Sequence, residues 1–222
     1  MTLQKLCQAV LCSDIITRKI KTEEKQALSA MYVSIVLSVV FNFMLSTLRP
    51  HHLKEELLQL VCEHPHCSND ILETLLSEET ECLNLKGYNG EIHELSQIIA
   101  KRCCNLVELS MCGVQSNYSD IFTVFKQLKF LETLDMSYVD EMNDAHVEYL
   151  LNHATKMTSI TLNWCHNISD RTIDYITLLC PAIIHLGLTG TSVTTIGVMK
   201  LNRCKYLQSL TLQGKLMLAM QI

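Results

Sequence analysis

Four side chains of types that bind zinc lie close together in this sequence. They are the two cysteines and two histidines of the stretch Cys62-Glu-His64-Pro-His66-Cys67. A tetrahedral zinc site usually separates its ligand pairs by a longer loop, because so short a turn cannot bring all four atoms to one ion. We therefore expect no metal here. We expect instead one helix that ends at Pro65 and a new helix that begins at Ser68-Asn69-Asp70.

A second group could supply nucleophilic chemistry. Cys165 and His166 are adjacent and Asp170 follows them, so a thiol and a base stand near each other in the chain. The repeat pattern described below explains Cys165 as a buried structural residue instead. The sequence also has no glycine-rich phosphate loop and no interleaved basic and aromatic patch. We expect no catalytic residue, no cofactor and no enzymatic activity.

These residues lie within a repeated pattern, L-x-x-L-x-L, that continues through the second half of the chain. Its fourth position falls at Leu83, Leu109, Leu134, Ile160, Leu186 and Leu210. A period of 24 to 26 residues is typical of leucine-rich repeats, in which each copy supplies one short strand and one helix. The sequence predicts an α/β fold: a leucine-rich-repeat solenoid of about six 24–26-residue repeats over residues 79–222, after a helical region over residues 1–78.

The composition agrees with a chain built from repeats. The 222 residues include 35 Leu and 11 Cys, and the apolar fraction of 48% excludes a disordered or collagen-like chain. With 18 basic and 23 acidic residues, the chain has no overall attraction to nucleic acid. Cys103, Cys180 and Cys204 precede successive strands by similar distances, so we interpret them as small buried apolar residues.

The cysteine positions resemble those of a known repeat class. The stretch Cys165-His-Asn-Ile168-Ser-Asp170, followed by Leu179-Cys180-Pro181, is similar to the cysteine-containing repeats of F-box/leucine-rich-repeat proteins and of the antagonist-of-mitotic-exit-network family. In that class one cysteine ends the turn after the strand and the other lies at the end of the helix. This resemblance implies a scaffold that binds other proteins.

The first helix carries a more specific resemblance. Residues 2–11 match [S/T]-L-x-x-x-C-x-x-x-[aliphatic], the elongin-C-binding box of cullin-RING substrate receptors, at Thr2, Leu3, Cys7 and Leu11. Leu3, Cys7 and Leu11 share one helix face, with Thr2 placed to cap the helix. The resemblance implies that this face binds a groove of elongin C.

A downstream segment resembles the cullin-contacting region of the same receptors. In Leu48-Arg49-Pro50-His-His-Leu53, the matching residues are Pro50 and Leu53, while Arg49 replaces an apolar residue. The order of the segments is similar to the Zyg/Zer family, whose C-terminal armadillo-like region is not in this sequence. The resemblance implies a cytoplasmic or nuclear adaptor that presents an unidentified protein substrate for ubiquitination.

Residues 27–48 have three possible interpretations: a membrane span, a buried helix or an insertion from the gene model. They contain no charged side chain and are long enough to span a bilayer, which leaves a membrane-anchored protein as an alternative. However, Ser34, Ser38, Asn42 and Ser46 form a polar stripe that suits a buried helix, and an insertion from the gene model is a third possibility. A glycan at the sequon of Asn117 or Asn167 would show that the repeats are lumenal.

The surface for a substrate is expected on the outward side of the strands. Outward residues flank the inward leucines and form columns across the stack, because side chains alternate along a strand. Trp164, beside the fourth strand, is the best single candidate for a contact that carries binding energy. The candidate substrate-binding residues are Ser110, Asp135, Thr161, Asn163, Trp164 and Thr189.

Overall fold

Short parallel strands form the sheet of this protein. The computed structural model describes residues 58, 62, 69–88, 92–114 and 124–213, all within the unit Glu55–Ile222. In these residues the sheet has six strands, which pair in sequence order. They are β1 (Cys82–Asn84), β2 (Glu108–Ser110), β3 (Thr133–Asp135), β4 (Ser159–Thr161), β5 (His185–Gly187) and β6 (Ser209–Thr211).

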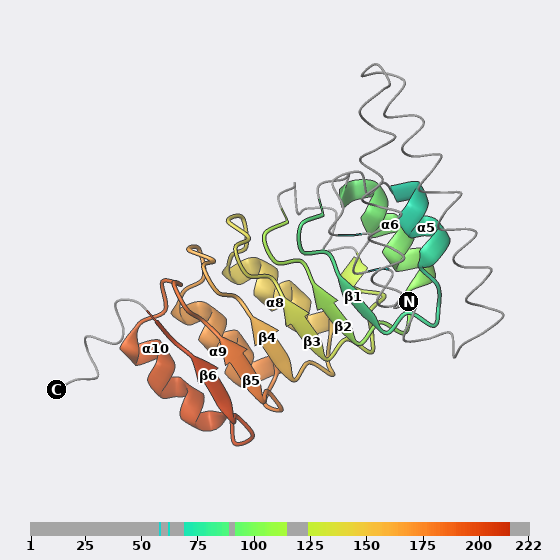
Figure 1. Cartoon of the computed structure of the whole chain (residues 1–222). Coiled ribbons are helices and arrows are strands. Elements are labelled where there is room, and N and C mark those ends of the chain that lie inside the picture. The colour runs from blue at the N-terminus through green and yellow to red at the C-terminus, as the bar shows by residue number, and fades with distance from the viewer. Residues whose placement is uncertain (1–57, 59–61, 63–68, 89–91, 115–123, 214–222) are drawn as a thin grey trace, which may run out of the picture. The chain divides into compact units, whose positions relative to one another are not determined.

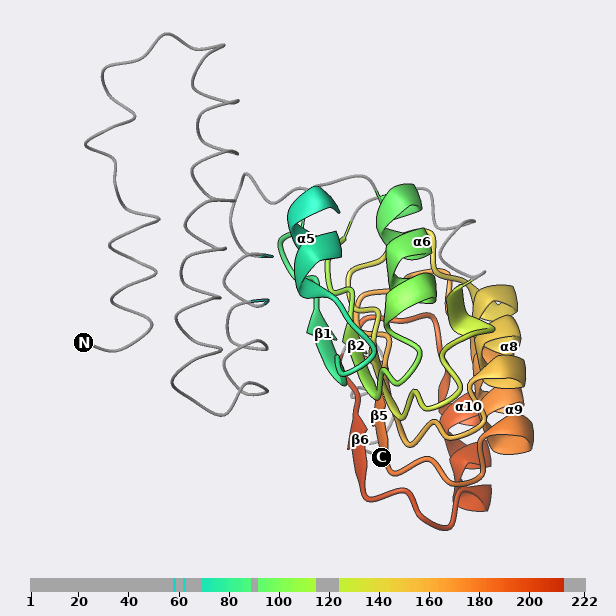
Figure 2. The same ribbon diagram turned by 90° about the vertical axis from the view of Figure 1, so that its right-hand side faces the viewer.

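The helices between the strands lie along one side of the sheet. They are α6 (Ile92–Arg102), α8 (Asp144–His153), α9 (Asp170–Leu179), α10 (Thr195–Met199) and the 3-10 helix η1 (Lys200–Arg203). Figures 1 and 2 show α6, α8, α9 and α10 on one side and the strands on the other. In four of the five intervals between strands the described residues form a helical segment. This alternation of strand and helix is the arrangement of a leucine-rich repeat and confirms the predicted α/β fold.

The register of the sheet aligns the repeated leucines. Leu83 pairs with Leu109, and the same central position continues through Leu134, Ile160, Leu186 and Leu210. The first five of these side chains are buried, whereas Leu210 in β6 is half-buried. The four central strands therefore have a neighbouring repeat on each side that helps to remove the central side chain from water.

The repeated cysteines lie in the core, as the sequence predicted. Cys103, Cys180 and Cys204 are each at most 5% exposed. Leu128 and Ala154 occupy the same position in the intervening repeats and are equally buried. The Cys180 thiol donates a hydrogen bond to the Met157 carbonyl at 3.0 Å, so it also joins adjacent repeats.

Aspartates connect the starts of α8 and α9 with the next repeat. Asp144, the first residue of α8, accepts hydrogen bonds from the Ser169 backbone N–H (2.9 Å), the Ser169 hydroxyl (2.6 Å) and the Thr172 hydroxyl (2.6 Å). Asp170, the first residue of α9, accepts from the Thr194 N–H and hydroxyl in the same way. Ser169 and Thr194 are themselves the N-caps of α9 and α10, so each aspartate fixes the cap of the following helix.

The region before β1 is described only in part. The helix α5 (Asn69–Leu75) begins where a new helix was expected after Pro65. The Tyr88 hydroxyl donates to the Asn69 side-chain oxygen, which connects α5 to the turn after β1. Among the residues the structure describes, no helix is long and apolar enough to cross a membrane. Residues 27–48 lie outside them, so their three interpretations stay open.

Gly197 in α10 is required by the close approach of Asp170. A Cβ atom at this position would overlap Asp170 Oδ1. Gly→Ala inside a helix normally stabilises a protein by about 0.5–1 kcal/mol. Here we expect Gly197→Ala to lower the free energy of unfolding by about 1–3 kcal/mol, because the carboxylate must leave the Thr194 cap. Urea denaturation measures the change.

The double variant gives the control for this prediction. In an Asp170→Ala background the overlapping carboxylate is gone, so Gly197→Ala should be neutral or stabilising. An equal loss of stability in both backgrounds would contradict the assigned contact between Gly197 and Asp170.

The Asp144 carboxylate also predicts a dependence of stability on pH. Burial on its own would raise the pKa of Asp144, but the hydrogen bonds from Ser169 and Thr172 outweigh it and hold the pKa below its ordinary value. The stabilisation is therefore present above the pKa of the unfolded chain, about 4, and is lost as pH falls through the lower folded pKa. Urea denaturation between about pH 5 and 2 measures the free energy of unfolding. As the pH falls, this free energy should decrease less for Asp144→Asn than for the wild type. Equal decreases in the two proteins would rule the effect out.

Candidate functional site

The strand face brings the predicted substrate-binding residues into adjacent columns. Ser110, Asp135 and Thr161 are direct partners in the register of β2, β3 and β4, and all three are half-buried. Asn163 is also half-buried, whereas Thr189 is only 8% exposed. The expected column is therefore less accessible at Thr189 than its outward position suggested. No observation tests the roles of these residues in binding.

Internal hydrogen bonds occupy part of this polar surface. Asp135 Oδ1 accepts from the Ser137 backbone N–H at 2.9 Å and from the Ser137 hydroxyl at 2.6 Å. Asn163 Oδ1 accepts from the Thr189 N–H at 2.8 Å, across neighbouring repeats. These bonds fix the side chains, so the face presents a rigid polar pattern.

A hollow of about 230 Å³ lies on the strand face over β1, β2 and β3. Its lining includes the carboxylate residues Glu108 and Asp135 and the hydroxyl residues Ser110 and Thr133. The buried residues Leu83 and Leu109 also line it, as does the buried Leu58 from the segment ahead of the repeats. The arrangement suits a side chain that is apolar along its stem and positively charged at its tip.

A repeated turn after each strand adopts a left-handed backbone conformation. In the described residues, positive φ angles occur at Gly87 (83°), Gly113 (71°), Tyr138 (60°), Trp164 (62°) and Gly190 (72°). These positions are 25 or 26 residues apart, so they are the same position of successive repeats. Glycine occupies it without strain, whereas a residue with a Cβ atom is disfavoured there by about 1–2 kcal/mol.

The backbone of the neighbouring repeats holds this turn in place. The Tyr138 N–H donates to the Asn163 carbonyl at 2.8 Å, and the Trp164 N–H donates to the Thr189 carbonyl at 2.6 Å. Gly113 donates to the Ser137 carbonyl in the same way. Because these bonds involve only the backbone, the conformation does not depend on the side chain at the turn.

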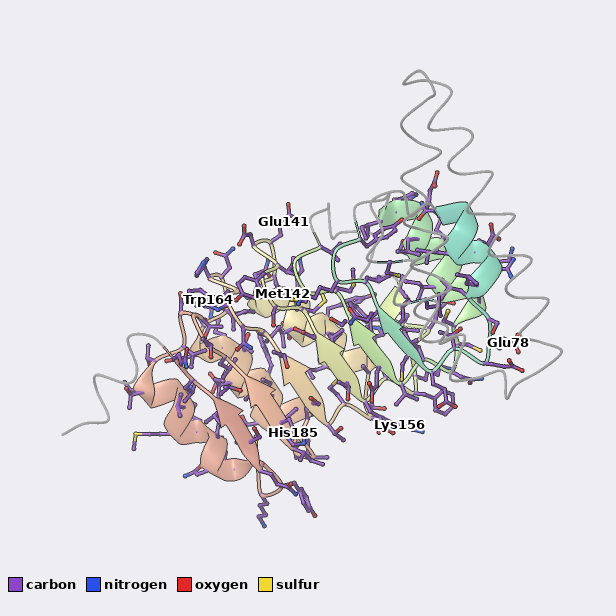
Figure 3. The ribbon with its side chains drawn as sticks, viewed as in Figure 1. Glu78, Glu141, Met142, Lys156, Trp164 and His185 are labelled. Atoms are coloured by element: carbon purple, nitrogen blue, oxygen red, sulfur yellow. The ribbon has the colours of Figure 1, made fainter. Side chains whose placement is uncertain are left out.

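The two aromatic residues at this position stack on each other. The rings of Tyr138 and Trp164 are nearly parallel, with centroids 6.1 Å apart and an angle of 15° between their planes. Both stay accessible, with exposed fractions of 56% and 43%. Figure 3 shows Trp164 and Glu141 at the edge where the strands end, with Lys156 and His185 at the opposite edge.

Gly190 and His166 complete the surroundings of Trp164. A Cβ atom at Gly190 would lie 2.7 Å from Trp164 Cε3, so the indole packs directly on the glycine backbone. His166 lies edge-on to the indole, and its Nδ1 donates to the Gly190 carbonyl at 3.1 Å. The sequence reasoning found Trp164 but missed Tyr138. Aligning the turn with Gly87, Gly113 and Gly190 at the repeat period would have found both.

The cysteine–histidine–aspartate group does not form a nucleophile. Cys165 is fully buried, and its thiol donates to the Met136 carbonyl at 3.1 Å. Burial raises the pKa of the Cys165 thiol to about 11. His166 Nδ1 is used by the Gly190 carbonyl, and Asp170 binds the Thr194 cap. Cys165 is therefore a structural residue, as the repeat pattern indicated.

Most of the Cys62–Cys67 stretch and the predicted elongin- and cullin-binding residues lie outside the described residues. Within the described ranges, no group of three or more His, Cys, Asp or Glu residues is placed to hold a metal ion. Of the stretch between Cys62 and Cys67, only the buried Cys62 is described. The predicted elongin-binding residues and the predicted cullin-binding Pro50 and Leu53 also lie outside the described residues. Those elongin-binding positions are Thr2, Leu3, Cys7 and Leu11.

The comparison with solved structures concerns the fold. The chain resembles Rad7 in the yeast Rad7–Elc1 complex with 17% identity and a TM-score of 0.62, covering 96% of this chain and 52% of that chain. The repeats have a leucine-rich-repeat fold. The chain spans about half the length of Rad7, and at this identity the likeness shows the fold alone.

Two further solved structures match over part of the chain. The actin-binding site 2 of leiomodin-1 has 12% identity and a TM-score of 0.44, covering 57% of this chain and 82% of that chain. An internalin of Listeria monocytogenes has 11% identity and a TM-score of 0.34, covering 59% and 51%. No protein-family model matches the chain.

The burial of the thiols predicts how the cysteines react. The exposed Cys104 should react with iodoacetamide at neutral pH in the native protein. Cys165 and Cys180, whose pKa values burial raises to about 11, should react only after unfolding. Peptide mass spectrometry after brief alkylation, with and without urea, measures both. Modification of native Cys165 at the rate of Cys104 would mean that this thiol is an accessible nucleophile.

Proposed function

We propose that this chain is a non-enzymatic substrate receptor of a cullin-RING ubiquitin ligase. Its first helix binds elongin C, the segment containing Pro50 and Leu53 contacts a cullin, and the strand face of the repeats holds a protein substrate. The chemistry belongs to the partners, and this chain contributes proximity and orientation. A protein with this role works in the cytoplasm or the nucleus.

The observation that carries the proposal is a sequence match to the elongin-C-binding box ahead of the leucine-rich repeats. Residues 2–11 match the elongin-C-binding box at every defined position, from Thr2 to Leu11. The side chains that would enter a groove recur every four residues and so share one helix face. The repeats follow in the same chain, so whatever they bind is carried to the partner of the helix.

The described repeats have the features of a rigid scaffold that could bind another protein. Their strands and caps are cross-connected between repeats by Asp144, Asp170 and the backbone bonds of the turns. The turns at the edge of the strand face bear two exposed aromatic side chains, Tyr138 and Trp164, of types that contribute strongly to protein–protein binding. The thiols of Cys165 and Cys180 are buried and protonated, so neither supplies a nucleophile on this face.

The fold comparison adds a precedent. Rad7 was solved in complex with Elc1, so one chain with this fold assembles with another protein. The alternatives are a leucine-rich-repeat scaffold without an elongin partner, of the F-box-like or mitotic-exit-antagonist kind, and a membrane-anchored repeat protein. A scaffold of the first kind would bind its substrate on the same strand face but would not bind elongin C. An elongin-binding experiment therefore separates it from the proposal.

A pull-down with the purified elongin B/C complex tests the proposal. The full chain should retain elongin C, and Leu3→Ala and Cys7→Phe should each reduce the retained amount by about tenfold or more, because both residues lie on the contact face. Lys5→Ala is the matched control, since Lys5 falls on the opposite side of the helix and should leave binding unchanged. The retained elongin C is quantified by immunoblotting.

Two outcomes would contradict the proposal. If the wild-type chain retains no elongin C, the scaffold without an elongin partner is favoured. If Lys5→Ala weakens binding as much as Leu3→Ala, the contact does not use the predicted face.

A further inference from the structure

We propose that Tyr138, Trp164 and Asp135 form a binding site for an arginine side chain in an extended segment of the substrate. This inference rests on the proposed function only in taking the strand face as the substrate surface. It adds the chemical class of the segment that is recognised. The arguments are the strained position of the aromatic residues, their exposure and the carboxylate at the start of the Tyr138 turn.

The aromatic residues occupy a position for which glycine is the less strained choice. Gly87, Gly113 and Gly190 adopt the same left-handed turn in other repeats. Tyr138 and Trp164 adopt it with φ angles of 60° and 62°, which bulky residues rarely do. Strain of this kind persists where the surrounding structure fixes the conformation, and it occurs often at binding sites.

Packing within the protein leaves about half of each of the two side chains accessible. Trp164 lies against Gly190 on one side and near Tyr138, yet it is 43% exposed, and Tyr138 is 56% exposed. No other ring of the described residues stacks on Tyr138. The backbone bonds to the Asn163 and Thr189 carbonyls fix where both side chains begin. The pair is therefore a rigid, accessible platform for a flat group.

A carboxylate with an unused oxygen lies at the start of the Tyr138 turn. Asp135 accepts hydrogen bonds from Ser137, the residue immediately before Tyr138, and it also borders the hollow on the strand face, which neither ring lines. Both hydrogen bonds from Ser137 fall on Oδ1, and Oδ2 accepts none from the described residues. Asp135 is half-buried, and a carboxylate forms its strongest hydrogen bonds with a positively charged donor.

The charges of the surface select a cationic ligand. Glu108 borders the same hollow as Asp135, and the exposed Asp140 and Glu141 follow Tyr138 in its turn. An arginine guanidinium is planar, stacks on aromatic faces and donates two parallel hydrogen bonds to a carboxylate. Lysine can supply the charge but neither the stacking plane nor the paired donors, so arginine fits the combination better.

Trp164 provides a direct measurement, because it is the chain's only tryptophan. The probe is an acetylated and amidated peptide of glycine and serine that carries two arginines. The comparison peptide has citrulline at both positions, which keeps the planar shape and removes the charge. Titration of the full chain at low salt should change the Trp164 fluorescence. The arginine peptide should bind about tenfold more tightly than the citrulline peptide.

Two variants separate recognition from stability. Asp135→Asn keeps an acceptor for Ser137 and removes the charge, so affinity for the arginine peptide should fall about tenfold, to that of the citrulline peptide. Tyr138→Gly restores the residue that other repeats use at this turn. It should leave the urea midpoint unchanged and weaken arginine binding by about tenfold, measured by calorimetry. A purely structural role for Tyr138 predicts the reverse: lower stability and unchanged binding.

The outcomes also distinguish this site from the proposed elongin contact. Leu3→Ala should still bind the arginine peptide, and Tyr138→Gly should still retain elongin C. Equal affinity for the arginine and citrulline peptides would overturn the arginine site, as would the absence of both a fluorescence change and heat of binding. Arginine binding by a chain that retains no elongin C would overturn the ligase role and leave the site in place.

Discussion

No repeat of this protein can bury its own strand, and the rest of the structure depends on that constraint. A strand of three residues has one inward central side chain, which other parts of the chain must cover. Leu109, Leu134 and Ile160 have a strand on each side and are buried. Leu210 in β6 has one described neighbouring strand and is half-buried, whereas Leu83 in β1 is buried with one neighbouring strand. The shared register follows, because a shift of one residue in the pairing would turn the leucine out of the core; the connections between strands absorb the variation of the period from 24 to 26 residues.

The same constraint explains how much of the fold could be predicted. Leu83 through Leu210 mark the strand centres in the sequence because every repeat buries the same position. Cys103, Cys180 and Cys204 could be placed in the core because they share a distance from the next strand. The aspartate contacts could not be predicted, since the partner of Asp144 is 25 residues away and its choice depends on how the helices stack.

The candidate site was predicted in part, for reasons that differ between its residues. Trp164 was predicted as a contact residue because it is a large side chain beside a strand. Its exposure and its stacking on Tyr138 depend on backbone angles, which residue types alone do not reveal. Thr189 was placed on the correct face, although the packing of its neighbours encloses it. Asp135 was identified by its column, whereas the use of only one of its oxygens by Ser137 needed the side-chain geometry.

The sequential strand order has a consequence for how the chain acquires its structure during synthesis. Each strand pairs only with the strands immediately before and after it in sequence, so no contact of the sheet waits for a distant part of the chain. A repeat leaving the ribosome can dock on its predecessor at once, with the earlier repeats as a template. Order can therefore spread from β1 towards β6 as translation proceeds, and an incomplete nascent chain always exposes just one growing edge.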